Sequence, residues 1–507
     1  MNMQRVVIVA LSEASPQLVE RLCDQGRMPH TQALRNTGLV GRTRYSTPYL
    51  LTPQMWATIV TGRTPGSHGV FDYWQRQTDG TFIETRGRDI RGRRIWDELS
   101  DQGIPSGIVN VPMTYPPAKT KGFSVSGQDA PGAHHSIAWP PTFYQELTQH
   151  FGRYHHKDIF PGGQTKERYA RILPDEVHRQ SDLFEWLTRR DDWRFLMLYT
   201  SGPAFAQHYF WADMDRGDGP TAGVIDQTFH AADEMVGRVN DILGSDDCIF
   251  VMSECGAGPI GGGVRLNTWL HQQGFLEYKS QTLSHSFRAQ WLSKLRVAAQ
   301  RYLPQNLFYL ANSLPLKGWI QTTIAGDRID WSRTVAFHRG KGEGNIYLNV
   351  AGRDPAGIVS KSDYERVRTE IIDRLTELRD PKTGSRVATA VHRREEIFSG
   401  ECVCCAPDLI VEWDGFRYMP SEDSDGSGEI FGDRTREYMT WPTTGSHRPE
   451  GLLVARGKGI CHRTLASPVE LIDLAPTWLS ILNCPVPFTM QGQPVPDMLP
   501  LDRAPRT

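Results

Sequence analysis

A threonine followed by a proline opens a segment whose residue types could support phosphoryl transfer. Thr52 and Pro53 begin the stretch 52–72, TPQMWATIVTGRTPGSHGVFD. Proline favours the first turn of a helix, so Thr52 is expected at a helix N-terminus. Free backbone N–H groups and the positive end of the helix dipole favour an alkoxide and a bound phosphoryl group there. The alternative is that Thr52 only caps the helix, a common role for threonine before proline.

Strands must position such a hydroxyl, and short apolar runs bounded by turn residues recur along the chain. They are Val6–Leu11, Gly107–Val111, Phe195–Thr200, Cys248–Ser253, Leu409–Trp413 and Leu452–Ala455. Runs of this kind, each followed by a helical stretch, predict parallel strands of an open doubly wound α/β sheet. Ligands bind beyond the carboxyl ends of such strands, so chemistry is expected at Ser12 and Glu13, at 201–208, and at Glu254 and Cys255.

The gross composition narrows the function classes. The 507-residue chain has a formal net charge of −2, with 39 % hydrophobic and 22 % charged residues, which is typical of a globular protein. Nucleic acid is not expected as the main partner, because phosphate-backbone binders usually carry a basic excess. No apolar run reaches the roughly 20 residues that span a bilayer, and Val6–Leu11 is too short for a signal-peptide core. We therefore expect no transmembrane segment, a cytoplasmic location and no disulfide framework among the eight cysteines.

A basic stretch interrupts the strand–helix pattern at 278–326. Between Tyr278 and Gly326 there is no Asp or Glu, and apolar residues recur at roughly helical spacing. The pattern predicts a basic amphipathic helix in a cap over the sheet. This cap could have a solvated basic face, cover an anionic substrate, or contact a protein partner or a membrane surface.

The segment 52–72 resembles the nucleophile segment of type I phosphodiesterases and nucleotide pyrophosphatases, which belong to the alkaline phosphatase superfamily. There a threonine opens a helix and a TG…P…HG stretch follows at fixed distance. The similarity continues collinearly through 253–259, 264–276, 329–337, 345–359, 378–384, 406–413, 445–460 and 472–487. It implies an alkaline phosphatase-like core in two parts, 1–277 and 327–507, separated by the cap insertion 278–326. It also implies that Thr52 is the nucleophile.

The same resemblance implies a metal site that is partly dismantled. Relatives hold two zinc-like ions with three Asp, three His and the threonine. Here two of the Asp positions are Ser12 and Ala204, and an Asp-His pair has become Glu254 and Cys255. His208 and His447 are the unchanged ligands. Glu13 adds a carboxylate at a position that is glycine in the family, and its side chain could point toward the site or away from it.

Charge compensation then limits the metal content. Two divalent ions need about four negative charges, and these positions supply about half of that, so a two-metal centre is not expected. One zinc could bind His208, His447 and Cys255, with Glu254 or water as the fourth ligand, a nitrogen, sulfur and oxygen set that suits tetrahedral zinc. Alternatively the histidines are satisfied polar residues of an ancestral site, and Cys255 is a small buried residue.

A polar group near the predicted site could bind phosphate without metal. It consists of His338, Arg339 and Lys341, and a solvated loop is the alternative interpretation.

These observations favour a phosphoester or phosphodiester hydrolase or group transferase that acts on a specific phosphorylated or nucleotide-linked, anionic substrate. It would act through Thr52 with at most one metal ion. The alternative is a catalytically inert pseudoenzyme that serves as a binding or scaffold protein, because Asp is lost at two positions and His at a third. A metal-free catalyst centred on Cys255 or Glu254 ranks last, because the neighbouring carboxylate disfavours the thiolate.

Overall fold

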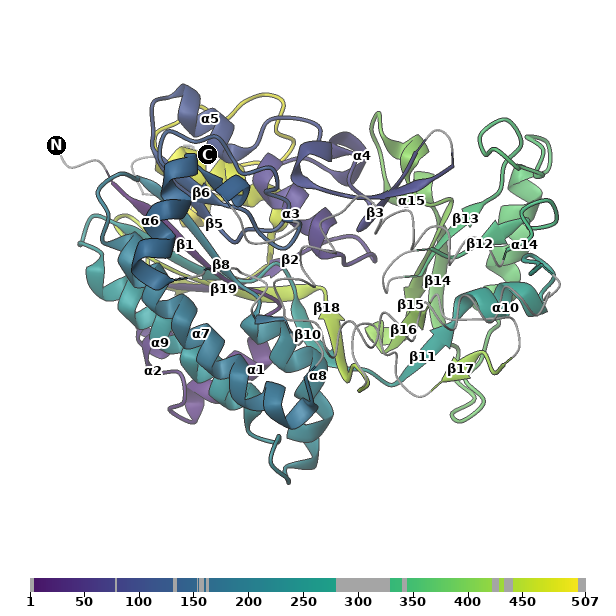
Figure 1. Cartoon of the computed structure of the whole chain (residues 1–507), viewed down its shortest axis with the longest axis horizontal. Helices are drawn as coiled ribbons and strands as arrows, with labels where there is room; N and C mark the ends of the chain where they lie inside the picture. The colour runs from purple at the N-terminus through teal and green to yellow at the C-terminus, as the bar shows by residue number, and fades with distance from the viewer. Residues whose placement is uncertain are drawn as a thin grey trace.

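The computed structural model describes residues 4–77, 80–130, 135–152, 154, 159–160, 164–279, 329–339, 344–421, 428–432 and 441–499. Its largest sheet has ten strands in the order β20-β2-β19-β9-β1-β8-β5-β6-β7, with β21 beside β2 (Figure 1). Their bounds are β1 Val6–Leu11, β2 Leu39–Arg44, β5 Ser106–Val109, β6 Phe123–Val125, β7 Ala138–Trp139, β8 Phe195–Thr200, β9 Cys248–Met252, β19 Glu450–Arg456, β20 Arg463–Thr464 and β21 Val469–Glu470.

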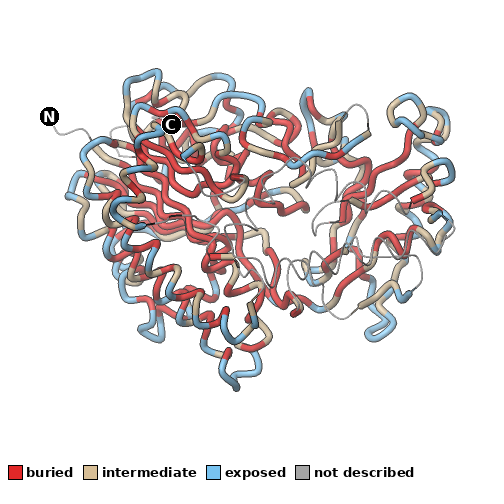
Figure 2. The backbone as a smooth tube through the Cα atoms, in the orientation of Figure 1, coloured by how far each residue is buried: buried red, intermediate tan, exposed pale blue. Residues whose placement is uncertain are grey.

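The centre of this sheet is parallel and buried on both faces. Strands β9, β1, β8, β5 and β6 run in one direction, and β1 pairs with β8 from Val6↔Phe195 onward. Every residue of β1 is fully buried, as the central strands of Figure 2 show. Because side chains alternate along a strand, Val7, Val9 and Leu11 pack into one hydrophobic cluster, and Val6, Ile8 and Ala10 pack into another.

Each of these clusters is closed by its own layer of helices, so the doubly wound α/β fold is confirmed. The first layer contains α1 Pro16–Asp24, α2 Pro29–Thr37, α6 Pro141–Phe151, α7 Lys166–Thr188, α8 Gly202–Arg216 and α9 Val224–Ile242. The second contains α3 Thr52–Thr61, α5 Ile95–Asp101 and α16 Leu474–Ile481. The two layers lie on opposite faces of the sheet in Figure 1.

Two of the apolar runs predicted as parallel strands of this sheet differ from that prediction, one in strand direction and the other in the sheet to which it belongs. Leu452–Ala455 lies within β19, which is antiparallel to both β2 and β9. Leu409–Trp413 forms β15 in a separate antiparallel sheet, so its assignment to the central sheet is wrong. A continuous apolar run shows that a strand is buried on both faces, but it does not show in which direction the strand runs or with which strand it pairs.

The separate sheet has its own hydrophobic core. It contains β12 Ala336–Phe337, β13 Asn345–Leu348, β15 Leu409–Trp413 and β14 Ala388–Arg393, in that order. Helices α10 Leu266–Gln272 and α14 Tyr364–Thr376 contribute to its core cluster. A two-stranded antiparallel ribbon of β10 Gly256–Pro259 and β18 Gly445–Arg448 lies between the two sheets in Figure 1.

The TG…HG part of the sequence motif has a structural role. Val70 N–H donates to His68 Nδ1 at 3.1 Å, so the ring proton lies on Nε2, which donates to Thr58 Oγ1 at 3.0 Å. Thr58 Oγ1 in turn donates to the Gln54 carbonyl, which ties helix α4 Pro65–His68 to α3. Burial, together with the charge of Arg63, lowers the pKa of His68 to about 3. The imidazole is therefore neutral at physiological pH and fixes the position of α3.

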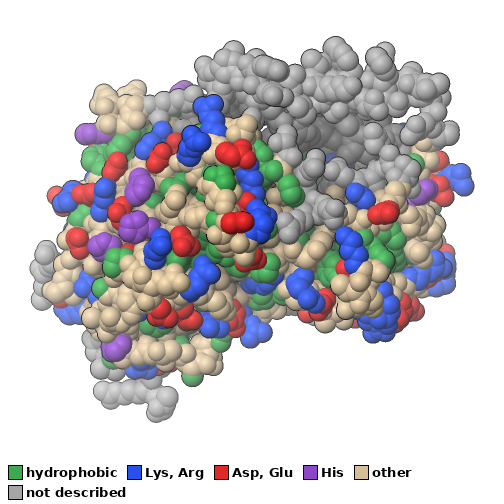
Figure 3. All heavy atoms as spheres, turned by 90° about the horizontal axis from the view of Figure 1, so that it is seen from below, with side chains coloured by type: hydrophobic (Ala, Val, Ile, Leu, Met, Phe, Trp, Pro, Cys, Tyr) green, Lys and Arg blue, Asp and Glu red, His purple; other side chains and the backbone are tan. Residues whose placement is uncertain are grey.

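Most of the predicted cap lies outside the described residues, because 280–328 are not among them. Within the described part of the chain, no helix has the length and apolar character needed to cross a bilayer. Lys and Arg side chains are interspersed with Asp and Glu on the face shown in Figure 3.

A buried carboxylate organises the separate sheet. Asp408 is fully buried directly before β15 and accepts two 2.7 Å bonds from Arg353 and a 2.6 Å bond from the Tyr364 hydroxyl. Burial alone would raise the pKa of Asp408, but the Arg353 guanidinium outweighs this effect and holds the pKa below its usual range. The charge on Asp408 therefore stabilises the packing of α14 against this sheet.

We expect Asp408→Asn to lower the free energy of unfolding by about 3 kcal/mol, because it leaves the half-buried Arg353 guanidinium without the buried anion that it pairs with. The midpoint of urea unfolding, followed by tryptophan fluorescence, measures the change. Asp414→Asn is the matched control, since Asp414 is 38 % exposed and pairs with the exposed Arg417. A similar small shift in both variants would contradict the assigned role of Asp408.

Candidate active site

Three titratable side chains converge beyond the carboxyl end of β1. Glu13 Oε1 lies 3.1 Å from His447 Nε2, and Glu13 Oε2 lies 2.9 Å from His208 Nε2. We call these three residues the Glu13 cluster. Their ligating atoms all lie within 4.8 Å of one another. Among the described residues, this is the one group of three or more His, Cys, Asp or Glu side chains close enough to hold a metal ion together.

The position of Glu13 follows from a tight turn after β1. Ala14 N–H donates to the Leu11 carbonyl at 3.1 Å, which closes a four-residue turn with Glu13 at its third position. Glu13 has a φ of 56°, in the left-handed region that some turns require at this position and that glycine adopts most easily. Gln207 Nε2 donates to the Glu13 carbonyl at 2.8 Å and holds the turn against α8.

The two histidines come from elements that are tied to each other. His208 lies on α8, and its carbonyl accepts a 2.6 Å bond from Thr444 N–H, directly before β18. His447 lies on β18 and pairs with Ala257 of β10. The cluster therefore joins three distant parts of the sequence at one point.

The charge on Glu13 is set by its neighbours. Burial alone would raise the pKa of Glu13, but the His208 and His447 imidazoles outweigh burial and hold the pKa well below its usual range. Glu13 is therefore a carboxylate that lies between the two rings and shares a hydrogen bond with His447 Nε2. A buried carboxylate with two imidazoles can hold a divalent cation or form a closed ion pair.

A second buried carboxyl, Glu254, belongs to a separate hydrogen-bonded chain. Gln128 Nε2 donates to the Tyr199 hydroxyl at 3.0 Å, Tyr199 donates to Ser12 Oγ at 2.8 Å, and Ser12 donates to Glu254 Oε1 at 2.8 Å. Burial, and next the negative charge of Glu13, raise the pKa of Glu254 to about 7. Two carboxyls near one site thus differ in protonation at neutral pH.

Thr52 is the first residue of α3 and is buried. The N-cap position is Leu51, so the structure does not support the interpretation of Thr52 as the capping residue. Trp56 lies four residues later on the same helix face, and its ring meets that of Tyr199 with centroids 5.3 Å apart. The face of α3 that carries Thr52 is therefore directed toward the Ser12–Glu254 chain.

The other predicted site residues lie outside the Glu13 cluster. Cys255 is fully buried in the hydrophobic cluster under α3 and does not belong to the Glu13 cluster. His338 is buried, and its Nδ1 lies 2.7 Å from the Asn345 carbonyl. The Arg339 guanidinium lies 4.7 Å from the centroid of the Phe82 ring, and Lys341 lies outside the described residues.

The sequence predicts His208 and His447 as metal ligands but leaves open whether the Glu13 side chain points toward the site. The side-chain direction depends on the backbone angle at residue 13, which no periodicity reveals. A signal was nevertheless present, because a carboxylate stands next to Ser12 at a position where the resemblance to the family implies a glycine. A charged residue in place of a turn glycine indicates that the side chain is needed.

The raised pKa of Glu254 predicts a pH effect on stability. The folded protein binds the proton more tightly than the unfolded chain, so this contribution is complete below pH 4.5 and is lost as the pH rises to about 7. Glu254→Gln removes the ionisation. In metal-free protein with chelator, we expect the variant to gain stability relative to the wild type across this window, by about 3 kcal/mol at most. Urea unfolding at pH 4.5, 6 and 8 measures it, and parallel profiles would contradict it.

Comparisons with known proteins agree with this architecture. Phosphonoacetate hydrolase from Sinorhizobium meliloti 1021, solved with phosphonoformate, is 12 % identical with a TM-score of 0.56, over 93 % of this chain and 94 % of that chain. Murine ectonucleotide pyrophosphatase/phosphodiesterase 5, solved with AMP, is 12 % identical with a TM-score of 0.52, over 96 % of each chain. The human protein of that name is 11 % identical over 97 % of each chain, with a TM-score of 0.52.

At these identities the solved structures show a common fold. A search of curated proteins found no match. The model of the type I phosphodiesterase / nucleotide pyrophosphatase family matches residues 6–435. This match covers most of the chain, and the parallel sheet and the helix that begins at Thr52 agree with it. The chain therefore belongs to the type I phosphodiesterase / nucleotide pyrophosphatase family of the alkaline phosphatase superfamily.

Proposed function

We propose that this chain is a hydrolase or group transferase for a specific phosphorylated or nucleotide-linked substrate, acting through Thr52 with at most one divalent ion. The family is one of phosphodiesterases and nucleotide pyrophosphatases. The observation that carries the finer proposal is the Glu13 cluster, which gathers two imidazoles and one carboxylate on the sheet edge where ligands of such folds bind.

The donor set fits one zinc ion. Two imidazole nitrogens and a glutamate oxygen within 4.8 Å of one another match the three protein ligands of many catalytic zinc sites, which leave a fourth position open. Glu13 thus takes the place that the sequence assigned to Glu254 and Cys255. A bound zinc ion would supply Lewis-acid stabilisation of phosphoryl oxygens. A second ion is disfavoured, because Glu254, with a pKa of about 7, is only partly ionised near neutral pH and offers less than a full negative charge.

The protein's own groups have distinct roles in this proposal. Thr52 Oγ1 forms a bond to the phosphorus while the bond from the phosphorus to the substrate's leaving group breaks. The N–H groups of the first turn of α3, which lack partners within a helix, stabilise the anionic oxygens. The pKa values of Glu13 and Glu254 are displaced in opposite directions. Glu254, with a pKa of about 7, suits accepting the proton of the Thr52 hydroxyl and passing it to the leaving group, whereas Glu13, whose pKa is strongly lowered, is a poor base and is assigned to the metal.

A non-catalytic binding role is the second candidate. Glu13 contacts both histidines, so the cluster satisfies its own charges without an ion. A closed ion pair of this kind would keep the fold and the anion pocket while turnover is lost. Metal binding and the response to substitution of Thr52 separate the two candidates.

Two further proposals concern regions or properties outside the described structure. The basic cap at 278–326 would cover the anionic substrate or contact a protein partner, because its sequence has basic residues and no acidic ones. The cytoplasmic location likewise remains a proposal from the sequence.

We expect at most one zinc ion per chain after purification without chelator, measured by elemental analysis. Glu13→Gln should weaken zinc binding at least tenfold, because even partners outside the first coordination shell contribute about 10–100-fold to affinity. Calorimetric titration of the apo-protein measures the change. Cys255→Ser is the control and should bind zinc as the wild type does. Two zinc ions per chain, or equal affinity in Glu13→Gln, would contradict this site.

We expect little turnover of bis(p-nitrophenyl) phosphate at neutral pH, even with added zinc, because one metal cannot supply the charge stabilisation of two. A screen of phosphorylated metabolites and nucleotide conjugates should reveal a specific substrate. On that substrate Thr52→Ala should lose roughly 10³-fold or more in kcat, while Thr52→Ser keeps the nucleophilic hydroxyl and most activity. Robust generic turnover would contradict the single-metal proposal. An unchanged native reaction in Thr52→Ala would favour the binding role.

A further inference from the structure

A cavity of about 670 Å³ lies beside the Glu13 cluster, between α1, α8 and the β10–β18 ribbon. Each residue of the cluster is close in sequence to a residue of the cavity wall: Ser15 follows Glu13 by two positions, Trp211 follows His208 by three, and Arg448 follows His447 directly. In Figure 1, α1 and α8 lie on one side of the ribbon and α3, which carries Thr52, lies on the other. The lining of the cavity includes neither Thr52 nor any residue of the Glu13 cluster, so the cavity is distinct from both.

The charges that line the cavity are mostly positive. Arg21, Arg44 and Arg448 come from three different elements, and Glu450 is the acidic residue of the lining. Glu450 already accepts a 2.8 Å bond from Arg42. Arg44 is exposed and lies directly across from Glu450 in the β2–β19 pair, but it forms no ion pair within 4 Å among the described residues. An anion in the cavity would meet this charge and the positive end of α1, whose first turn forms part of the wall.

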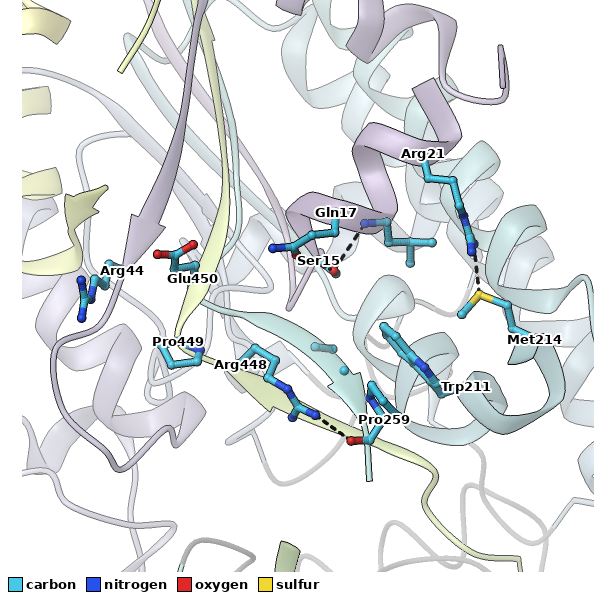
Figure 4. Close-up of a pocket in the computed structure, with 13 residues that line it drawn as sticks. Ser15, Gln17, Arg21, Arg44, Trp211, Met214, Pro259, Arg448, Pro449 and Glu450 are labelled. Atoms are coloured by element: carbon cyan, nitrogen blue, oxygen red, sulfur yellow. Dashed lines mark hydrogen bonds between the residues drawn. The ribbon is translucent and has the colours of Figure 1, made fainter. Parts of the chain in front are cut away.

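Arg448 is held in place by main-chain oxygens. Its guanidinium donates to the carbonyls of His447 at 2.8 Å, Phe416 at 3.0 Å and Pro259 at 2.6 Å, the last of which is drawn in Figure 4. The ribbon has a glycine at the point of closest approach, since a Cβ at Gly258 would lie 2.7 Å from Arg448 Nε. This arrangement fixes a planar cation on the cavity wall before any ligand binds, which lowers the cost of ordering it.

An aromatic surface completes the lining. Trp211 is half-buried on α8 and lines the same cavity as Met214 and Pro259 (Figure 4). An indole beside guanidinium groups suits a ligand that carries both a flat ring and an anionic group. A volume of about 670 Å³ lies within the range of small-molecule sites and is large enough for a nucleotide.

We propose that this cavity is a second ligand site, which binds an aromatic phosphate of nucleotide size. The phosphate lies between Arg44 and Arg448, and the ring packs on Trp211. Binding at this site does not require Thr52 or a metal ion, so it stands apart from the proposed reaction.

The test is calorimetric titration of the full chain with AMP, inorganic phosphate and adenosine. AMP should bind at least tenfold more tightly than either of the others, because both halves of the ligand are recognised. Arg44→Gln should weaken AMP binding about fivefold, and Trp211→Leu should weaken it at least fivefold. Both side chains lie at the surface of the cavity, and circular dichroism checks that the variants fold.

The controls separate this site from the proposed active site. Arg463→Gln removes a similarly exposed charge from the neighbouring strand β20 outside the cavity, and it should leave AMP binding unchanged. Thr52→Ala and Glu13→Gln should also keep it. Absence of AMP binding at millimolar concentration would overturn the proposal. Binding that survives both Arg44→Gln and Trp211→Leu but is lost in Thr52→Ala would place AMP at the active site instead, and would equally overturn it.

Discussion

One buried carboxylate between two imidazoles connects the parts of this site. Glu13 follows the first strand, His208 lies on α8, and His447 lies on a ribbon near the end of the chain. Each contact crosses a large sequence separation, so the site exists only when the sheet, its helix layer and the ribbon are all in place. An isolated buried carboxylate would be neutral or highly destabilising, and the imidazoles allow this one to remain charged.

The general fold could be predicted because its signals are local. The run Val6–Leu11 coincides with β1 and Phe195–Thr200 with β8, since buried parallel strands are continuous apolar segments. Strand direction could not be predicted for Leu452–Ala455, nor sheet membership for Leu409–Trp413. Both depend on pairing with distant strands, which a single apolar run does not encode.

The site was predictable to the extent that it depends on residue identity. His208 and His447 were identified by resemblance, and the structure brings them together. Cys255 was named on the same basis but packs into the core cluster, because the residues that follow β9 turn into the ribbon. The direction of the Glu13 side chain could not be predicted, because it is decided by a single backbone angle. The protonation of Glu254 likewise depends on burial that only the folded chain shows.

The left-handed backbone at Glu13 has an evolutionary consequence. Glycine would relax this turn but would remove the anion that joins the histidines. Conversely, placing aspartates at Ser12 and Ala204 would crowd new carboxylates around a centre that Glu13 already occupies. The effect of a substitution at any of these three positions thus depends on the residues at the other two.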